Sequence, residues 1–131
     1  MSLWSFGKFE REVDFTDADF LANLEDAKKS MNEAMNQVPK VGKTSDIVLA
    51  QTECFYIFFD VLFGPGSGEA VFEGKHSLEL CIRAAESITE FEHTETERID
   101  SAYKKYYVKN HGNRSQRRQY YKGNQNKAKR R

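Results

Sequence analysis

One long apolar stretch, residues 47–63, stands out in the pattern of hydrophobic and polar positions along the chain. Its few plainly polar residues are Gln51, Thr52, Glu53 and Asp60. Seventeen residues that include two carboxylates make a poor bilayer span. A helix that is apolar around most of its circumference requires burial against several neighbours. We therefore predict a core helix over Ile47–Phe63, with one polar stripe formed by Glu53, Tyr56 and Asp60.

The first residues follow a period of two, which is typical of a strand with one buried face. Phe9, Arg11 and Val13 alternate with acidic residues. The aromatic residues before them are followed by Gly7-Lys8, a pair that suits a type II′ turn because glycine comes first. The sequence predicts an N-terminal β-hairpin, and its aromatic face must pack on a helical layer because a lone hairpin is marginally stable in water.

Two amphipathic helices are predicted on either side of the core helix. The first follows Thr16, a suitable N-cap, with a hydrophobic staple between Phe15 and Phe20, and Pro39 ends it. Its apolar residues, spaced by three and four, are Phe20, Leu24, Ala27, Met31, Ala34, Met35 and Val38. The second follows Ser77, and its apolar residues are Leu78, Cys81, Ile82, Ala85, Ile88 and Phe91.

The connections are marked by glycine and polar residues. Ser45 and Asp46 are suitable caps for the core helix. Residues 64–77 contain four glycines and a proline, which predicts a turn with one helical turn at Glu69–Phe72. Residues 92–98 contain no apolar residue. Either the preceding helix continues here in solvent, or Thr94 and Glu97 form a capping box that starts a new helix.

These elements predict a mainly α fold of the α+β type, with the N-terminal β-hairpin packed on a bundle of three to four helices. A chain of 131 residues suits one domain, which we place at residues 1–109. Residues 110–131 contain a single aliphatic residue, so burial cannot offset the entropy lost on ordering them. We expect this basic C-terminal tail to be disordered.

The net charge of zero hides a division of the chain. Residues 1–102 contain 20 acidic and nine basic residues, whereas residues 103–131 contain 11 basic residues and no acidic one. An acidic body with a basic tail is typical of chains whose tail takes part in an interaction. It also suggests head-to-tail contact between copies of the chain.

The cysteines and the N-terminus indicate a reduced, cytosolic setting. Cys54 and Cys81 both fall on apolar helix faces, and two cysteines form no disulfide framework. We therefore predict that they are small buried hydrophobic side chains. The first residues lack the apolar region of a signal peptide.

The motifs for catalysis, nucleotide binding and metal binding are not matched. Five residues separate Gly68 from Gly74 where a phosphate-binding loop has four, and the lysine after them is followed by histidine. The three histidines, His76, His93 and His111, have no second ligand at metal-binding spacing. We therefore expect no cofactor, no metal and no enzymatic activity.

The basic tail is the remaining functional signal. Its cations are interleaved with tyrosines, a composition that suits phosphate contact combined with base stacking. The same composition suits docking on an acidic protein, which is the interpretation we favour. A tail that only keeps the protein soluble would have this composition as well. A small nucleic-acid-binding protein that uses this Tyr/Arg-rich tail is therefore the alternative function.

The order of features resembles a known family. A strand pair that ends in VDFTDADF leads through helices to FFDVLFGPGSGEAVFEGKHSLELCIRAAESI, then to a polar helix and a tail that contains NRSQRR. This order is similar to that of the tail assembly chaperones of long-tailed, siphovirus-type phages and prophages of Gram-positive bacteria. The similarity spans most of the chain, and its motifs are structural.

The resemblance implies a mainly helical, non-enzymatic assembly factor in the cytoplasm of the bacterial host. Such chaperones coat the tape measure protein until tail tube subunits displace them, and they are absent from the mature virion. They tend to self-associate, and a longer frameshifted product often recruits tube protein. The implied partners are the tape measure protein, the tail tube protein and further copies of the chain, with no membrane involved.

A chaperone for an amphipathic helix needs exposed apolar surface that adapts to its partner, a role suited to Met and Phe. The apolar candidates for partner binding are Met31, Met35, Phe55, Phe58, Phe59 and Phe63. The candidates in the tail are Arg114, Arg117 and Arg118. Burial in the core is the alternative for each apolar candidate.

Overall fold

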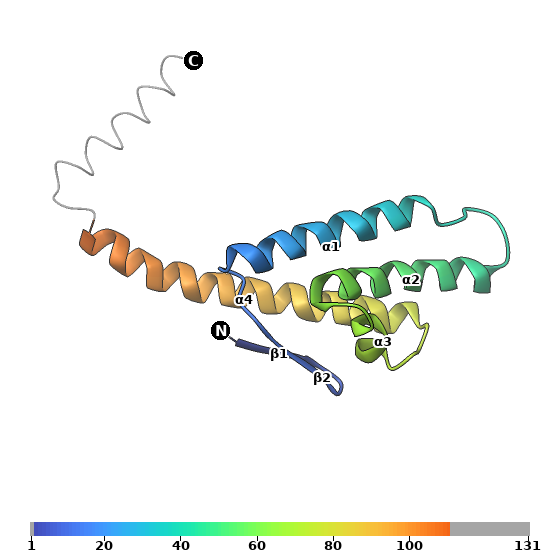
Figure 1. Ribbon diagram of the computed structural model, residues 1–131, viewed down its shortest axis with the longest axis horizontal. Helices are drawn as coiled ribbons and strands as arrows, with labels where there is room; N and C mark the ends of the chain where they lie inside the picture. Colours follow the sequence, from blue (N-terminus) through green and yellow to red (C-terminus); the bar gives the residue numbers. More distant parts are fainter. Residues whose placement is uncertain (1, 111–131) are drawn as a thin grey trace, which may run out of the picture. The chain divides into compact units, whose positions relative to one another are not determined.

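The computed structural model describes residues 2–110 (Figure 1). Its elements are β1 (Ser2–Phe6), β2 (Phe9–Val13), α1 (Ala18–Asn36), α2 (Thr44–Phe63), α3 (Ser67–Phe72) and α4 (Leu78–Asn110). The predicted fold, mainly helical with an N-terminal hairpin packed on the helices, is confirmed. The expected disorder of the tail concerns residues that, from residue 111 on, lie outside the described part of the chain.

The chain divides into two compact units, Met1–Thr96 and Glu97–Arg131. The first unit holds the hairpin, α1 to α3, the beginning of α4 and all residues of the hydrophobic core. The described part of the second unit is residues 97–110, the end of α4, where Tyr103 and Tyr106 are exposed.

The hairpin forms as the alternating pattern predicts. β1 and β2 are antiparallel, with Phe6 opposite Phe9 across a two-residue turn. Gly7 has a φ of 60° and Lys8 is not among the residues with positive φ, which matches the predicted II′ turn. One face buries aromatic and aliphatic side chains, while Arg11 on that face stays exposed with its guanidinium 4.6 Å from the centre of the Phe9 ring.

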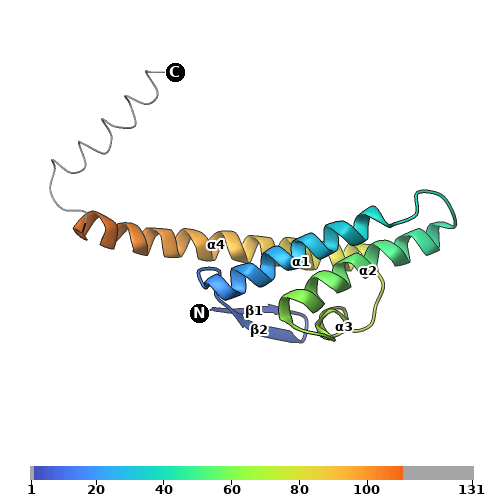
Figure 2. The same ribbon diagram turned by 45° about the horizontal axis from the view of Figure 1, so that its top comes forward.

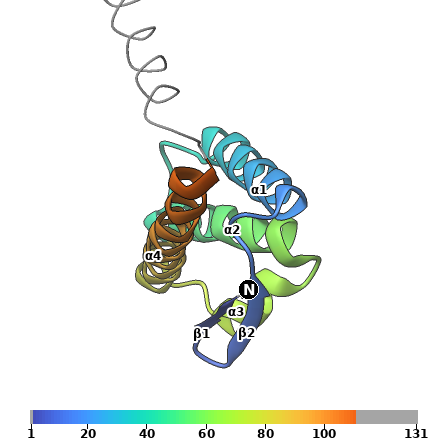
Figure 3. The same ribbon diagram turned by 90° about the vertical axis from the view of Figure 1, so that its left-hand side faces the viewer.

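Stacked aromatic rings attach the hairpin to α2. The Trp4 ring lies parallel to Phe59 at a centroid distance of 5.7 Å and to Phe63 at 6.0 Å. The Trp4 indole N–H donates to the Ser87 hydroxyl of α4 at 3.1 Å. Phe72 of α3 meets Phe59 edge to face at 5.5 Å. Hairpin and α3 therefore lie on the same side of α2 (Figure 3).

Helices α1 and α2 lie side by side and run in opposite directions (Figures 1 and 2). The predicted staple is present, with the Phe15 and Phe20 rings 5.3 Å apart. The predicted cap is wrong by one residue: the Asp17 carboxylate accepts a hydrogen bond from the Phe20 amide at 2.9 Å. The amide and the hydroxyl of Thr16 both donate to the Asp14 carboxylate instead.

The start of α2 also differs from the prediction. Lys43 occupies the N-cap position without a side-chain hydrogen bond, so Ser45 and Asp46 lie inside the first turn of the helix. An acidic residue in the first turn still stabilises the helix, because it faces the positive end of the helix dipole. The helix therefore begins before the residues that were expected to cap it.

The glycine-rich segment after α2 is a turn that contains α3, as predicted. Gly64 and Gly66 have φ values of 116° and 90°, which side-chain-bearing residues rarely adopt. The Gly68 amide donates to the Asp60 carboxylate at 2.7 Å. Asp60, which the sequence places in the polar stripe of the core helix, therefore binds the amino end of α3.

Helix α4 begins as predicted, and its length decides whether residues 92–98 continue this helix or start a new one. The Ser77 hydroxyl accepts a hydrogen bond from the Leu80 amide at 3.3 Å, as a capping residue does. The helix then continues from Leu78 to Asn110 without a break. Thr94 therefore does not start a new helix.

We expect Gly68→Ala to destabilise the protein. A Cβ at this position would lie 2.6 Å from the Tyr56 carbonyl oxygen and 2.8 Å from its Cα, so α2 and α3 must move apart. Such overpacking costs about 1–3 kcal/mol of unfolding free energy, measured by urea denaturation followed by circular dichroism. The exposed neighbour Glu69→Ala is the control and should change stability by less than about 0.5 kcal/mol. Equal midpoints for the two variants would contradict the close packing.

Candidate functional site

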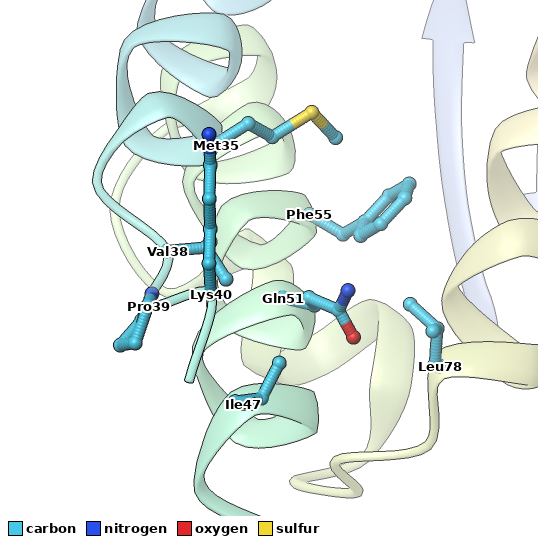
Figure 4. Close-up of a pocket in the computed structure, with 8 residues that line it drawn as sticks. All are labelled: Met35, Val38, Pro39, Lys40, Ile47, Gln51, Phe55 and Leu78. Carbon is cyan, nitrogen blue, oxygen red and sulfur yellow. The ribbon is translucent and has the colours of Figure 1, made fainter. Parts of the chain in front are cut away.

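The candidate functional site is an apolar groove built from two pockets that share Phe55. The first has a volume of about 590 Å³ and is lined by Met35, Val38, Pro39, Lys40, Ile47, Gln51, Phe55 and Leu78 (Figure 4). The second has a volume of about 340 Å³ and is lined by Phe55, Ile82, Ala85, Glu86, Thr89 and Glu90. We call the two pockets together the Phe55 groove.

Helix α2 forms one wall of the groove with a single row of side chains. Ile47, Gln51 and Phe55 are four residues apart and therefore lie on one face of the helix. The end of α1 adds Met35, which is 40% exposed. In Figure 4 the side chains of Met35, Phe55 and Leu78 surround the same space. The flexible thioether of Met35 allows this wall to adapt to an occupant.

Helix α4 forms the other wall because it has two adjacent apolar faces. Cys81, Ala84 and Ile88 are buried in the core. Leu78 and Ile82 lie on the neighbouring face, which lines the groove. Ile82, which the sequence groups with the other apolar residues at helical spacing, is 43% exposed.

The two ends of the groove differ in charge. Lys40 is the charged residue that lines the first pocket, whereas Glu86 and Glu90 line the second. Glu86 and Glu90 are four residues apart, so both carboxylates stand on the same face of α4. The apolar floor is thus bordered by a cation at one end and by two acids at the other.

The structure places the predicted partner-binding residues in three different settings. Met35 and Phe55 line the groove. Phe58 and Phe59 are buried in the core, 7% and 0% exposed, and Phe63 and Met31 are partly buried against it. The candidates in the tail, Arg114, Arg117 and Arg118, lie outside the described residues.

Sequence reasoning missed a second apolar row on α2. Leu49, Ile57 and Val61 are 42%, 37% and 36% exposed. With Glu53 they form a row at intervals of four residues on the side of the helix away from Phe55. Glu53 was the available signal, because a charged side chain within an apolar helix marks its solvent-facing side.

Two side chains, His76 and Tyr56, make contacts between α2 and the loop before α4. The His76 ring stacks on Tyr56 at 4.9 Å, and its Nδ1 lies 3.2 Å from the hydroxyl of the buried Thr52. The Tyr56 hydroxyl donates to the Lys75 carbonyl at 2.7 Å, and burial is the main cause that raises its pKa. These contacts hold the loop before α4 against α2.

The two cysteines are buried and free, as predicted. Burial raises the pKa of the Cys81 thiol from 9.0 to about 11, and burial is also the main cause that raises the pKa of Cys54. Within residues 2–110, side chains that could ligate a metal ion do not gather in groups of three or more. No helix of this described part has the length and apolar character needed to cross a membrane.

The described residues form a small helical body with an open apolar groove on its surface. The chain belongs to DUF6673, a family of unknown function, which matches residues 7–131. No curated protein and no solved structure matches the chain.

The raised pKa of Cys81 predicts a loss of stability at high pH. Below pH 9 the thiol is protonated in both the folded and the unfolded state, so it causes no pH dependence. Between pH 9 and about 11 the unfolded thiol ionises while the folded one keeps its proton, so the unfolding free energy falls by about 2–3 kcal/mol.

Urea denaturation between pH 8 and 11 measures this fall, and Cys81→Ala supplies the comparison. The variant starts from a lower stability because it leaves a small cavity. Its unfolding free energy should nevertheless decline less steeply with pH than that of the unaltered protein. If the unfolding free energy of the two proteins declined equally with pH, this would refute the assignment of the pH dependence to Cys81.

Proposed function

We propose that this protein is a non-enzymatic tail assembly chaperone that binds the phage tape measure protein and protects it during tail morphogenesis. The observation that carries the proposal is the Phe55 groove, an open apolar surface bordered by helices. Helical clients dock in such grooves through side chains at positions i, i+3 or i+4, and i+7. The order of sequence features shared with tail assembly chaperones supports the same function.

The two pockets suit such a client because they lie on either side of one ring. Anchor side chains one or two turns apart on the client helix would enter the two pockets and enclose Phe55 between them. Met35 and Ile82, both exposed at the walls, would then cover the apolar stripe of the client. A client whose stripe is covered no longer exposes an apolar patch through which it aggregates.

The groove also suits a contact that must later be released. It engages one face of a helix and leaves the other faces of the client open to arriving tube subunits. Contacts of small area are typical of transient association, whereas permanent complexes bury far larger apolar surfaces. Reversible binding is what a chaperone displaced during tube assembly requires.

Two isoleucine substitutions test the proposal. Ile82→Glu places a carboxylate in the groove, whereas Ile57→Glu places one on the opposite row of α2 at a similar exposure, 43% against 37%. A tape measure fragment from the same phage genome is co-expressed with each variant of the full chain. We expect the unaltered protein and Ile57→Glu to keep the fragment soluble and to co-purify with it, and Ile82→Glu to lose both.

Circular dichroism of each variant checks that the fold is intact. Equal recovery of the fragment with both variants would contradict the groove as the binding surface. Failure of the unaltered protein to retain any tape measure fragment would contradict the chaperone function itself. Oligonucleotide binding that survives Ile82→Glu would instead favour the nucleic-acid alternative.

A further inference from the structure

The Phe55 groove has opposite charges at its two ends. Lys40 lines the first pocket, whereas Glu86 and Glu90 line the second. All three residues are exposed, and none of them has an ion-pair partner among residues 2–110. Their charges therefore face solvent, where an occupant of the groove can pair with them.

The groove is long enough for about three turns of a bound helix. Leu78 lines the first pocket and Glu90 lines the second, and both belong to α4. Between these two residues α4 advances by about 18 Å, at about 1.5 Å per residue. A helix of about twelve residues therefore spans both pockets, with one end beside Lys40 and the other beside Glu86 and Glu90.

The apolar floor of the groove does not set the direction of such a helix. Met35, Phe55 and Ile82 offer apolar surface along its length, and the burial of apolar surface has no directional preference. The charges differ between the two ends, so they distinguish one direction from the other. Complementary charges across an interface fix the orientation of a partner more than they raise its affinity.

We propose that the groove selects an amphipathic client helix with opposite charges at the two ends of its apolar stripe, an inference that rests on the proposed function. Lysine or arginine of the client pairs with Glu86 and Glu90, and a client carboxylate pairs with Lys40. Arginine suits the acidic end because its guanidinium can donate two parallel hydrogen bonds to one carboxylate.

The charge order of the client then decides where and in which direction the protein binds. A helix with the same charge at both ends places like charges together at one end of the groove, which disfavours binding. On a long helical client, each stretch with opposite charges around an apolar stripe is a docking position. The direction of each bound copy follows from the order of the charges in that stretch.

Two designed peptides of about 14 residues test the proposal on the isoleucine-labelled full chain. They have the same composition and the same stripe of leucines. The first has two lysines before the stripe and two glutamates after it, and the second has the reverse order. Their ends are acetylated and amidated, which removes the terminal charges. A nitroxide at one end or the other broadens the methyl signals near it, those of Ile47 in the first pocket or of Ile82 in the second.

We expect the lysine end of both peptides to broaden Ile82 and the glutamate end to broaden Ile47, so that the two peptides lie in opposite directions. If the same terminus broadened Ile82 in both peptides, or if each label broadened both methyl signals equally, the proposal would be overturned and the groove would still be a binding surface. If neither peptide bound, the proposed function would lose its site as well. Shifts of both methyl signals when the protein alone is concentrated would place a second copy in the groove and also overturn the proposal.

Charge removal supplies the matching measurement on the protein. At low salt Glu86→Gln combined with Glu90→Gln should weaken the binding of both peptides by about threefold or more. Asp26→Asn combined with Glu33→Gln is the control, because it removes two exposed carboxylates of α1 that line neither pocket. The difference should vanish at about 0.5 M salt, where charges are screened over a few ångströms. Equal affinities of the two variants at low salt would overturn the proposed pairing.

Discussion

The stack of Trp4 on Phe59 is the contact on which the rest of the structure depends. Phe59 lies near the C-terminal end of α2, fully buried, where the hairpin and α3 both reach it. Trp4 in turn reaches α4 through its hydrogen bond to Ser87. The stack therefore places the hairpin, α3 and α4 around one side of α2 and leaves the row that contains Phe55 to form a groove.

The groove exists because α4 buries only one of its two adjacent apolar faces in the core. Its buried face, Cys81, Ala84 and Ile88, is committed to the core, so the adjacent apolar face at Leu78 and Ile82 cannot also be covered by the same neighbours. Helix α1 packs on α2 without closing this face. The result is apolar surface that a folded body exposes in a fixed place, which is the physical requirement for holding an apolar client without unfolding.

Local chemistry made much of this fold predictable, and tertiary contacts decided the rest. Gly7-Lys8, Ser77 and the glycines after Phe63 act within a few residues, so their turns and caps could be predicted. The period of the core helix could not separate Phe55 from Phe58 and Phe59, because almost the whole circumference of that helix is apolar. Nor could the helical period of α4 show which of its two adjacent apolar faces enters the core. Asp60 contacts an amide eight residues away, which no helical pattern reveals.

Methyl NMR of isoleucine-labelled full chain, titrated with a tape measure fragment, tests the central claim most directly. Ile47 and Ile82 line the groove, whereas Ile57 lies on the opposite row of α2. If the Phe55 groove binds the client, the methyl signals of Ile47 and Ile82 shift or broaden as the fragment is added, and that of Ile57 stays in place. A shift confined to Ile57 would contradict this account.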